Sequence, residues 1–120
     1  MQKKTLVLGA SPKPERYSNK AVQMLLQNNH PVEAVGARDA SIGGVKIQTG
    51  TPQFDDIHTV TMYLGPRNQN NVYEYILNLK PKRIIFNPGT ENNEFMQMAD
   101  NNGIEVEVAC TLVLLSTDQF

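Results

Sequence analysis

Several residues near the start of the chain have the types and spacing of a phosphate-binding site. Gly9 ends the apolar run of residues 5–8 and is followed by Ala10 and Ser11. A glycine at a strand exit lets the backbone approach a phosphate closely, as in the first loop of dinucleotide-binding folds. The full G-x-G-x-x-G pattern is absent, because prolines follow this one glycine. A tight strand exit without a ligand is the competing interpretation.

A second group of residues follows this loop at the predicted start of a helix. Ser18, Asn19 and Lys20 open the helical pattern, and Arg16 lies just before it. Free backbone N–H groups and the positive end of the helix dipole favour an anion there, and the two basic side chains add charge. The alternative is an ordinary serine cap with solvated basic side chains.

A third candidate site lies just after the second predicted strand, at Gly36, Ala37 and Arg38. Dinucleotide folds use an acidic residue in this place to hold the ribose of NAD. A basic residue instead fits a phosphorylated ribose, such as the 3′-phosphate of coenzyme A or the 2′-phosphate of NADP. An exposed loop arginine without a ligand is the other interpretation.

The remaining reactive side chains lack partners in the sequence. Cys110 is the single cysteine, and neither of the two histidines is close to it in the sequence. We therefore interpret it as a buried, inert thiol. His30 and His58 are interpreted as structural or surface residues. The carboxylates show no pair placed for acid–base work. We therefore expect no catalytic residues and no metal site.

The elements that must position these residues alternate between strands and helices. Apolar runs predict strands near residues 5–8, 32–35, 45–47, 58–64, 83–86 and 104–108. Helical spacing predicts helices from Ser18 to about residue 27, from a cap at Asn68 to about residue 80, and around residues 95–103. Residues 39–44 are predicted to be a turn, and residues 110–115 either a short helix or an edge extension.

This alternation predicts an α/β fold with a Rossmann-like, doubly wound parallel sheet in a three-layer α/β/α arrangement. Ligands bind such sheets at the carboxyl ends of the strands, where the strand order reverses. We therefore expect residues 9–11 to lie beside residues 64–67. The residues predicted to lead the core are Leu6, Val7, Leu8, Val22, Leu25, Val60, Met62, Ile76, Leu79, Ile84, Ile85 and Met98.

The length of the chain indicates the number of domains, and its net charge argues against some classes of function. A chain of 120 residues predicts one domain, residues 1–120. The net charge is −1, and the sequence has no block of like charges. We therefore expect no basic surface that would bind nucleic acid or an anionic membrane. The start of the chain lacks a signal-peptide core or a membrane span, so we expect a cytoplasmic protein.

The run of residues 4–18 resembles the opening of the small CoA-binding-domain proteins, which are related to the nucleotide domain of the succinyl-CoA synthetase α subunit. Residues 44–47, the Gly65-Pro66 strand exit, residues 87–91 and Cys110 keep that family's order and spacing. The resemblance implies cofactor contacts at Gly9, Ala10, Ser11, Arg16, Tyr17, Ser18, Asn19, Lys20, Gly36, Arg38, Leu64 and Pro66. Many relatives have asparagine-proline after the second strand where this chain has Gly36-Ala37-Arg38. The ligase's second domain and its phosphorylated-histidine segment are absent from this sequence, so ligase activity does not transfer.

Three functions follow from these observations. The first is a non-catalytic binding module for coenzyme A or an acyl-CoA, acting as a carrier, a sensor or a subunit. The second is an NAD(P)-binding oxidoreductase or redox sensor, which the incomplete glycine pattern disfavours. The third is an interaction subunit with a vestigial pocket. The expected partner is a small nucleotide ligand, and a homo-oligomer or a larger enzyme partner stays open.

Overall fold

The chain alternates strands and helices along most of its length. The computed structural model describes residues 2–120, and within them seven strands form one sheet. The strands are β1 (Thr5–Ala10), β2 (Val32–Gly36), β3 (Ala40–Ile42), β4 (Val45–Gln48), β5 (Thr59–Met62), β6 (Arg83–Phe86) and β7 (Glu105–Val108). The α-helices are α1 (Tyr17–Gln27), α2 (Tyr73–Leu79), α3 (Asn93–Asn101) and α4 (Thr111–Ser116).

The sheet has the order β3-β4-β2-β1-β5-β6-β7, with β1 at its centre. Every neighbouring pair is parallel except β3 and β4, which are antiparallel. The chain moves outward from β1 on one side through β2 and then returns to the other side with β5. The reversal of strand order therefore lies between β1 and β5, which confirms the predicted doubly wound sheet.

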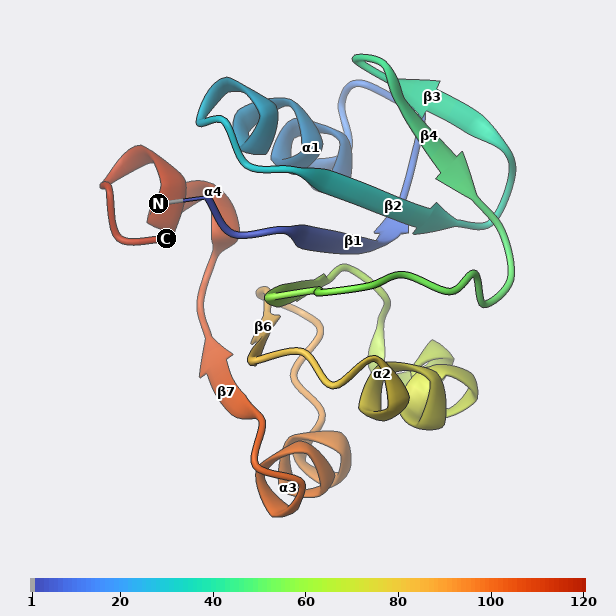
Figure 1. Ribbon diagram of the computed structural model, residues 1–120, viewed down its shortest axis with the longest axis vertical. Helices are drawn as coiled ribbons and strands as arrows, with labels where there is room; N and C mark the ends of the chain where they lie inside the picture. The colour runs from blue at the N-terminus through green and yellow to red at the C-terminus, as the bar shows by residue number, and fades with distance from the viewer. Residues whose placement is uncertain (1) are drawn as a thin grey trace.

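Helices cover both faces of this sheet, as Figure 1 shows. Because side chains alternate along a strand, Leu6 and Leu8 of β1 face one way and Val7 faces the other. Leu6 and Leu8 pack in a cluster with Ile76 of α2 and Phe95 of α3. On the opposite face, α1 supplies the buried Val22 and Leu25, and α4 supplies Leu115. No helix within residues 2–120 is long and apolar enough to cross a membrane.

The predicted burial of two core residues is too high. Leu79 and Met98 are only partly buried at the rim of the core, whereas the other ten predicted residues are buried. Phe86 and Phe95 are fully buried and form an edge-to-face pair with ring centroids 5.9 Å apart. The largest aromatic side chains of the core were therefore missing from the prediction.

Several element boundaries also differ from the sequence-based expectation. The predicted turn of residues 39–44 contains β3, which forms a hairpin with β4. The segment predicted to start a helix at Asn68 instead forms two short 3₁₀ turns, Pro66–Asn68 and Asn70–Val72, before α2 begins. The N-cap residue of α1 is Arg16 rather than Ser18. Residues 110–115 were predicted to be either a short helix or an edge extension, and the structure has a short helix there, α4.

One histidine at the amino end of the sheet makes stability depend on pH. The backbone N–H of Lys3 donates to Nδ1 of His30 at 3.0 Å, which requires that nitrogen to be unprotonated. Burial lowers the pKa of His30 below its ordinary value of 6.5, and the charges of Lys3 and Arg83 lower it further. As the pH falls, the unfolded chain therefore takes up the proton first. This contribution to stability is complete above about pH 6.5 and is lost below it.

We accordingly expect the urea midpoint of unfolding to decrease between about pH 7 and about pH 5. His30→Gln should show a smaller decrease. Some of it should persist, because burial and the charge of Arg83 also lower the pKa of His58. Urea titrations of both proteins across this range measure the effect. Identical pH profiles for the two proteins would show that His30 makes no such contribution.

Candidate functional site

A cavity of about 550 Å³ lies at the carboxyl ends of the central strands. It is formed by the loops after β1, β2, β5 and β6 and by the start of α1, which is where the strand order reverses. Its volume lies within the range of small-molecule sites. The lining residues are Gly9, Ala10, Ser11, Pro12, Lys13, Arg16, Tyr17, Ser18, Ala37, Arg38, Tyr63, Leu64, Gly65, Pro88, Gly89 and Thr90.

Gly9 lets the exit of β1 lie directly against the neighbouring strand exit. Its φ of +97° lies in the region that favours glycine. A Cβ atom at this position would lie 2.9 Å from the carbonyl carbon of Tyr63 and 3.1 Å from the nitrogen of Leu64. Gly9 therefore contributes only backbone to the cavity lining, and the exits of β1 and β5 lie in close contact.

The loop from β1 into α1 brings positive charge and the first turn of a helix to the cavity. Ser11 is held by the buried Asn19, whose Nδ2 donates to its carbonyl at 3.0 Å. Since the cap residue Arg16 makes no side-chain capping bond, the first N–H groups of α1 have no partner from that side chain. The exposed side chains of Lys13 and Arg16 lie on the same rim. This end of the cavity is suited to a phosphate group.

The end of β2 contributes a third basic side chain. Ala37 and Arg38 line the cavity, and Arg38 is exposed. Gly36 does not line it. Instead, Gly36 pairs with Ala10 in the sheet, and a Cβ atom there would lie 2.2 Å from the Ala10 carbonyl oxygen. The role of Gly36 is thus to let β2 approach β1 where β1 leaves its regular register.

The opposite wall is neutral and comes from the ends of β5 and β6. Tyr63, Leu64 and Gly65 follow β5, and Pro88, Gly89 and Thr90 follow β6. Sequence reasoning expected Leu64 and Gly65 beside residues 9–11, although it named only Leu64 as a cofactor contact. It missed the other four, although the rule that ligands lie at strand ends also applies to the exit of β6.

The hydroxyl of Tyr63 is buried and has no hydrogen-bond partner within residues 2–120. Burial raises the pKa of Tyr63 to about 12, with a smaller contribution from Cys110. The phenol therefore stays neutral at physiological pH. Cys110 itself is half-buried, so the prediction of a buried thiol is wrong in degree.

The structure brings together eight of the twelve predicted site residues. They are Gly9, Ala10, Ser11, Arg16, Tyr17, Ser18, Arg38 and Leu64. The four outside the lining are Asn19, Lys20, Gly36 and Pro66. Lys20 is exposed, with its Nζ 5.6 Å from the centroid of the Tyr17 ring. Pro66 is the exposed first residue of a 3₁₀ turn.

Two buried amide side chains hold the neutral wall in place. Nε2 of Gln69 donates to the carbonyl oxygens of Leu64 at 2.9 Å and Thr90 at 2.8 Å, and so ties the two loops together. Its Oε1 accepts from Asn92 at 3.1 Å. Asn87 anchors the second loop, because its Nδ2 donates to the Met62 carbonyl at 2.8 Å. No motif in the sequence distinguishes Gln69 from the exposed glutamines.

We expect Gln69→Ala to destabilise the fold by about 1–3 kcal/mol, since it leaves two loop carbonyls without their buried donor. The matched control is Gln97→Ala, which removes an exposed amide that bonds only to Asn101. Urea unfolding of both variants measures the difference. Equal losses of stability in the two variants would mean that the buried hydrogen bonds of Gln69 stabilise the fold no more than the exposed hydrogen bond of Gln97 does.

Within residues 2–120 no group of three or more histidine, cysteine or acidic side chains could hold a metal ion.

Comparison with solved structures finds several chains with the same fold. The crystal structure of an uncharacterized protein is 45% identical, with a TM-score of 0.97, and the match covers 100% of this chain and 99% of the other. A hypothetical protein from Pyrococcus horikoshii OT3 is 28% identical, with a TM-score of 0.86 and coverage of 97% and 83%. The Thermus thermophilus protein cell-free ID.343 is 21% identical, with a TM-score of 0.84 and coverage of 99% and 91%. None of the curated proteins matches this chain significantly.

The family described as "CoA binding domain" matches residues 3–116. That range contains every strand of the sheet and every residue that lines the cavity. The chain therefore belongs to the CoA binding domain family, which supports a general role in binding coenzyme A.

Proposed function

We propose that this chain binds coenzyme A or an acyl-CoA in the cavity at the carboxyl ends of β1, β2, β5 and β6. The observation that carries the proposal is the charge of the lining. Its charged members are Lys13, Arg16 and Arg38, and none of the described lining residues is acidic. The whole chain has a net charge of −1, so this positive character is local. Coenzyme A carries its phosphates at one end, which matches a lining with basic groups on one side.

The pyrophosphate is expected over residues 9–11 and the start of α1. There the bare backbone at Gly9 permits close approach, and the free N–H groups of the helix can donate to phosphate oxygens. Hydrogen bonds to charged groups contribute about 1.5–3 kcal/mol each. The 3′-phosphate is expected at Arg38, the basic residue of the β2 exit.

The pantetheine arm is expected along the neutral wall. Leu64, Gly65, Pro88 and Gly89 offer apolar surface and backbone groups without charge. An uncharged amide-containing chain suits such a lining better than a second phosphate-bearing group does. An acyl group would extend the same arm.

A binding role fits the lining better than catalysis does. Among the described residues that line the cavity there is no histidine, carboxylate or cysteine to serve as acid, base or nucleophile. In this proposal residues 1–120 act as one cytoplasmic domain that carries, senses or presents the ligand, alone or as a subunit of a larger assembly.

NADPH is the second candidate ligand, because Arg38 would also suit a 2′-phosphate. Calorimetric titration of the purified chain with coenzyme A and with NADPH distinguishes the two. We expect saturable binding of coenzyme A and at least about tenfold weaker binding of NADPH. Tighter binding of NADPH would replace the proposal with the redox alternative. No binding of either ligand at millimolar concentration would favour an interaction subunit with a vestigial pocket.

A further inference from the structure

The large aromatic side chain of Tyr17 is exposed at the edge of the cavity. Tyr17 is the first residue of α1, it lines the cavity, and it is 68% exposed. Single exposed apolar residues are ordinary at a protein surface, and Val108 and Val113 are examples in this chain, each 54% exposed. Those two valines lie outside the cavity lining, whereas Tyr17 belongs to it. Its exposed ring is therefore available to a molecule in the cavity.

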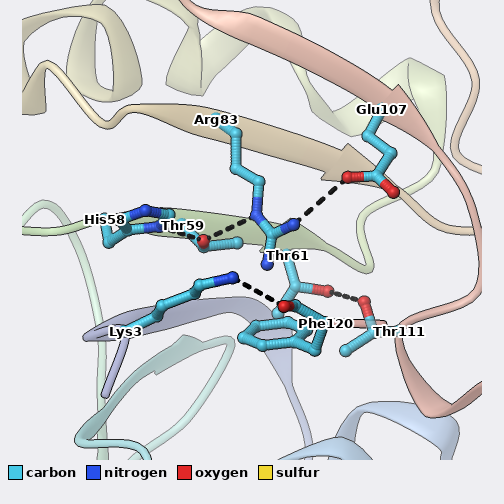
Figure 2. Close-up of polar contacts among 8 residues, drawn as sticks. All are labelled: Lys3, His58, Thr59, Thr61, Arg83, Glu107, Thr111 and Phe120. Atoms are coloured by element: carbon cyan, nitrogen blue, oxygen red, sulfur yellow. Dashed lines mark hydrogen bonds and ion pairs between the residues drawn. The ribbon is translucent and has the colours of Figure 1, made fainter. Parts of the chain in front are cut away.

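Packing within the fold accounts for another aromatic ring that contacts a cation, the ring of Phe120. Its centroid lies 4.5 Å from Cζ of Arg83, which is only 6% exposed. Figure 2 shows how Arg83 is fixed: its Nε donates to Oγ1 of Thr59 at 2.9 Å and its Nη1 to Oε1 of Glu107 at 3.2 Å. The ring of Phe120 thus covers a buried, hydrogen-bonded cation of the fold.

The ring of Tyr17 contacts an exposed cation instead. Nζ of Lys20, three residues further along α1, lies over the ring at 5.6 Å from its centroid. Cation–π contacts at exposed sites are weak, so this contact adds little to the stability of the fold. Because Lys20 lies over one face and the side chain is 68% exposed, the ring retains surface on which a flat group can stack.

The covalent structure of coenzyme A places its base beside the two phosphate positions assigned above. One ribose carries the adenine, the 3′-phosphate and, through its 5′ carbon, the pyrophosphate. The base therefore lies within one sugar ring of the start of α1 and of Arg38. The described lining contains two aromatic residues, and Tyr17 is the one at this positively charged end, next to Arg16. The other, Tyr63, follows β5 in the neutral wall.

We propose that the ring of Tyr17 stacks on the adenine of the bound ligand and makes the cavity selective for the nucleotide half of coenzyme A. The proposal rests on the proposed function and adds a residue that recognises the base. Every base has a flat π-face, and stacking on an aromatic side chain is a general way in which proteins bind bases. Tyr17 is thus expected to distinguish ligands with a base from ligands that carry phosphate alone.

Calorimetric titration with the two halves of coenzyme A tests this role. The probes are adenosine 3′,5′-bisphosphate and 4′-phosphopantetheine, together with coenzyme A itself. Tyr17→Ala should weaken coenzyme A and the bisphosphate by the same factor, about five- to thirtyfold. It should leave 4′-phosphopantetheine unchanged, because that half has no base. Tyr17→Phe keeps the ring and should bind all three ligands within about twofold of the wild type.

Two results of these titrations would overturn the proposal. Equal weakening of both halves by Tyr17→Ala would show a general change in the cavity rather than the loss of a contact with the base. A loss in Tyr17→Phe as large as that in Tyr17→Ala would show that the hydroxyl, not the ring, contacts the ligand.

A fluorescence measurement reports the stacking itself. The chain contains no tryptophan, so Tyr17→Trp introduces a single indole at the proposed contact. Adenosine 3′,5′-bisphosphate should quench its emission in a saturable way. The matched control is Val113→Trp, at an exposed apolar position of α4 outside the cavity lining, and its emission should not change.

The two readouts separate this proposal from the proposed function. If calorimetry shows that Tyr17→Trp binds coenzyme A while the indole emission stays constant, stacking is wrong and the binding of coenzyme A stands. If the wild type binds neither coenzyme A nor the bisphosphate at millimolar concentration, the proposed function is wrong and the role of Tyr17 is refuted with it.

Discussion

Replacing Arg38 with alanine is expected to weaken the binding of coenzyme A about ten- to a hundredfold, while affecting dephospho-coenzyme A much less. The reason is that Arg38 is the basic residue of the β2 exit that lines the cavity, where we place the 3′-phosphate. A charge-assisted contact to phosphate contributes on the order of 1.5–3 kcal/mol. Since Arg38 is exposed, screening by solvent places the effect nearer the lower end of that range.

Calorimetric titration of both ligands into both proteins measures this differential. Arg67→Ala is the matched control, because Arg67 is also an exposed arginine near a strand exit but lies outside the cavity lining. It should leave both affinities unchanged. If Arg38→Ala weakened both ligands equally, Arg38 would not recognise the 3′-phosphate.

Truncating Ile84 to alanine is expected to destabilise the fold by about 2–5 kcal/mol. Ile84 lies in the middle of β6, is 0% exposed, and pairs with Val60 on one side and Val106 on the other. Its side chain belongs to the cluster that α2 and α3 cover. Strands on both sides restrict how far the surrounding chain can collapse into the space left behind, so a cavity would remain.

Urea unfolding measures the loss, with Val113→Ala as the control. Val113 is a similar aliphatic residue on α4, but it is 54% exposed, so its truncation removes little buried surface. We expect a change within about 0.5 kcal/mol for this control. A midpoint in Ile84→Ala that matched the wild type would refute the placement of Ile84 in the core.

The parallel part of the sheet was predictable because its strands are short apolar runs. Residues 5–8 and 83–86 are buried on both faces, so their sequences show little polar alternation and end at turn residues. The hairpin strand β3 was missed for the opposite reason. It has three residues, and the turn-forming Asp39, Gly43 and Gly44 surround it. Its pairing with β4 depends on tertiary contacts that three residues cannot signal.

The positively charged half of the cavity was predictable from strand ends, whereas the neutral half was mostly not. Gly9 and Arg38 each follow an apolar run, and the fold brings such positions together. Thr90 follows the strand β6 in the same way, but a neutral residue in a proline-glycine turn gives no sign of a ligand. Gln69 is harder still, since its importance comes from burial and from two carbonyls that only the folded chain brings within reach.

The central claim is that coenzyme A occupies the cavity at the carboxyl ends of the strands, and mapping of amide shifts on the ¹⁵N-labelled chain tests it most directly. Titration with coenzyme A should produce saturable shifts at residues 9–11, 16–18, 37–38, 63–65 and 89–90, which line the cavity and carry an amide N–H. The amino ends of the strands, around Lys3 and Arg83, should remain unchanged. Saturable shifts confined to that opposite end, or no saturable shift at millimolar coenzyme A, would contradict the claim.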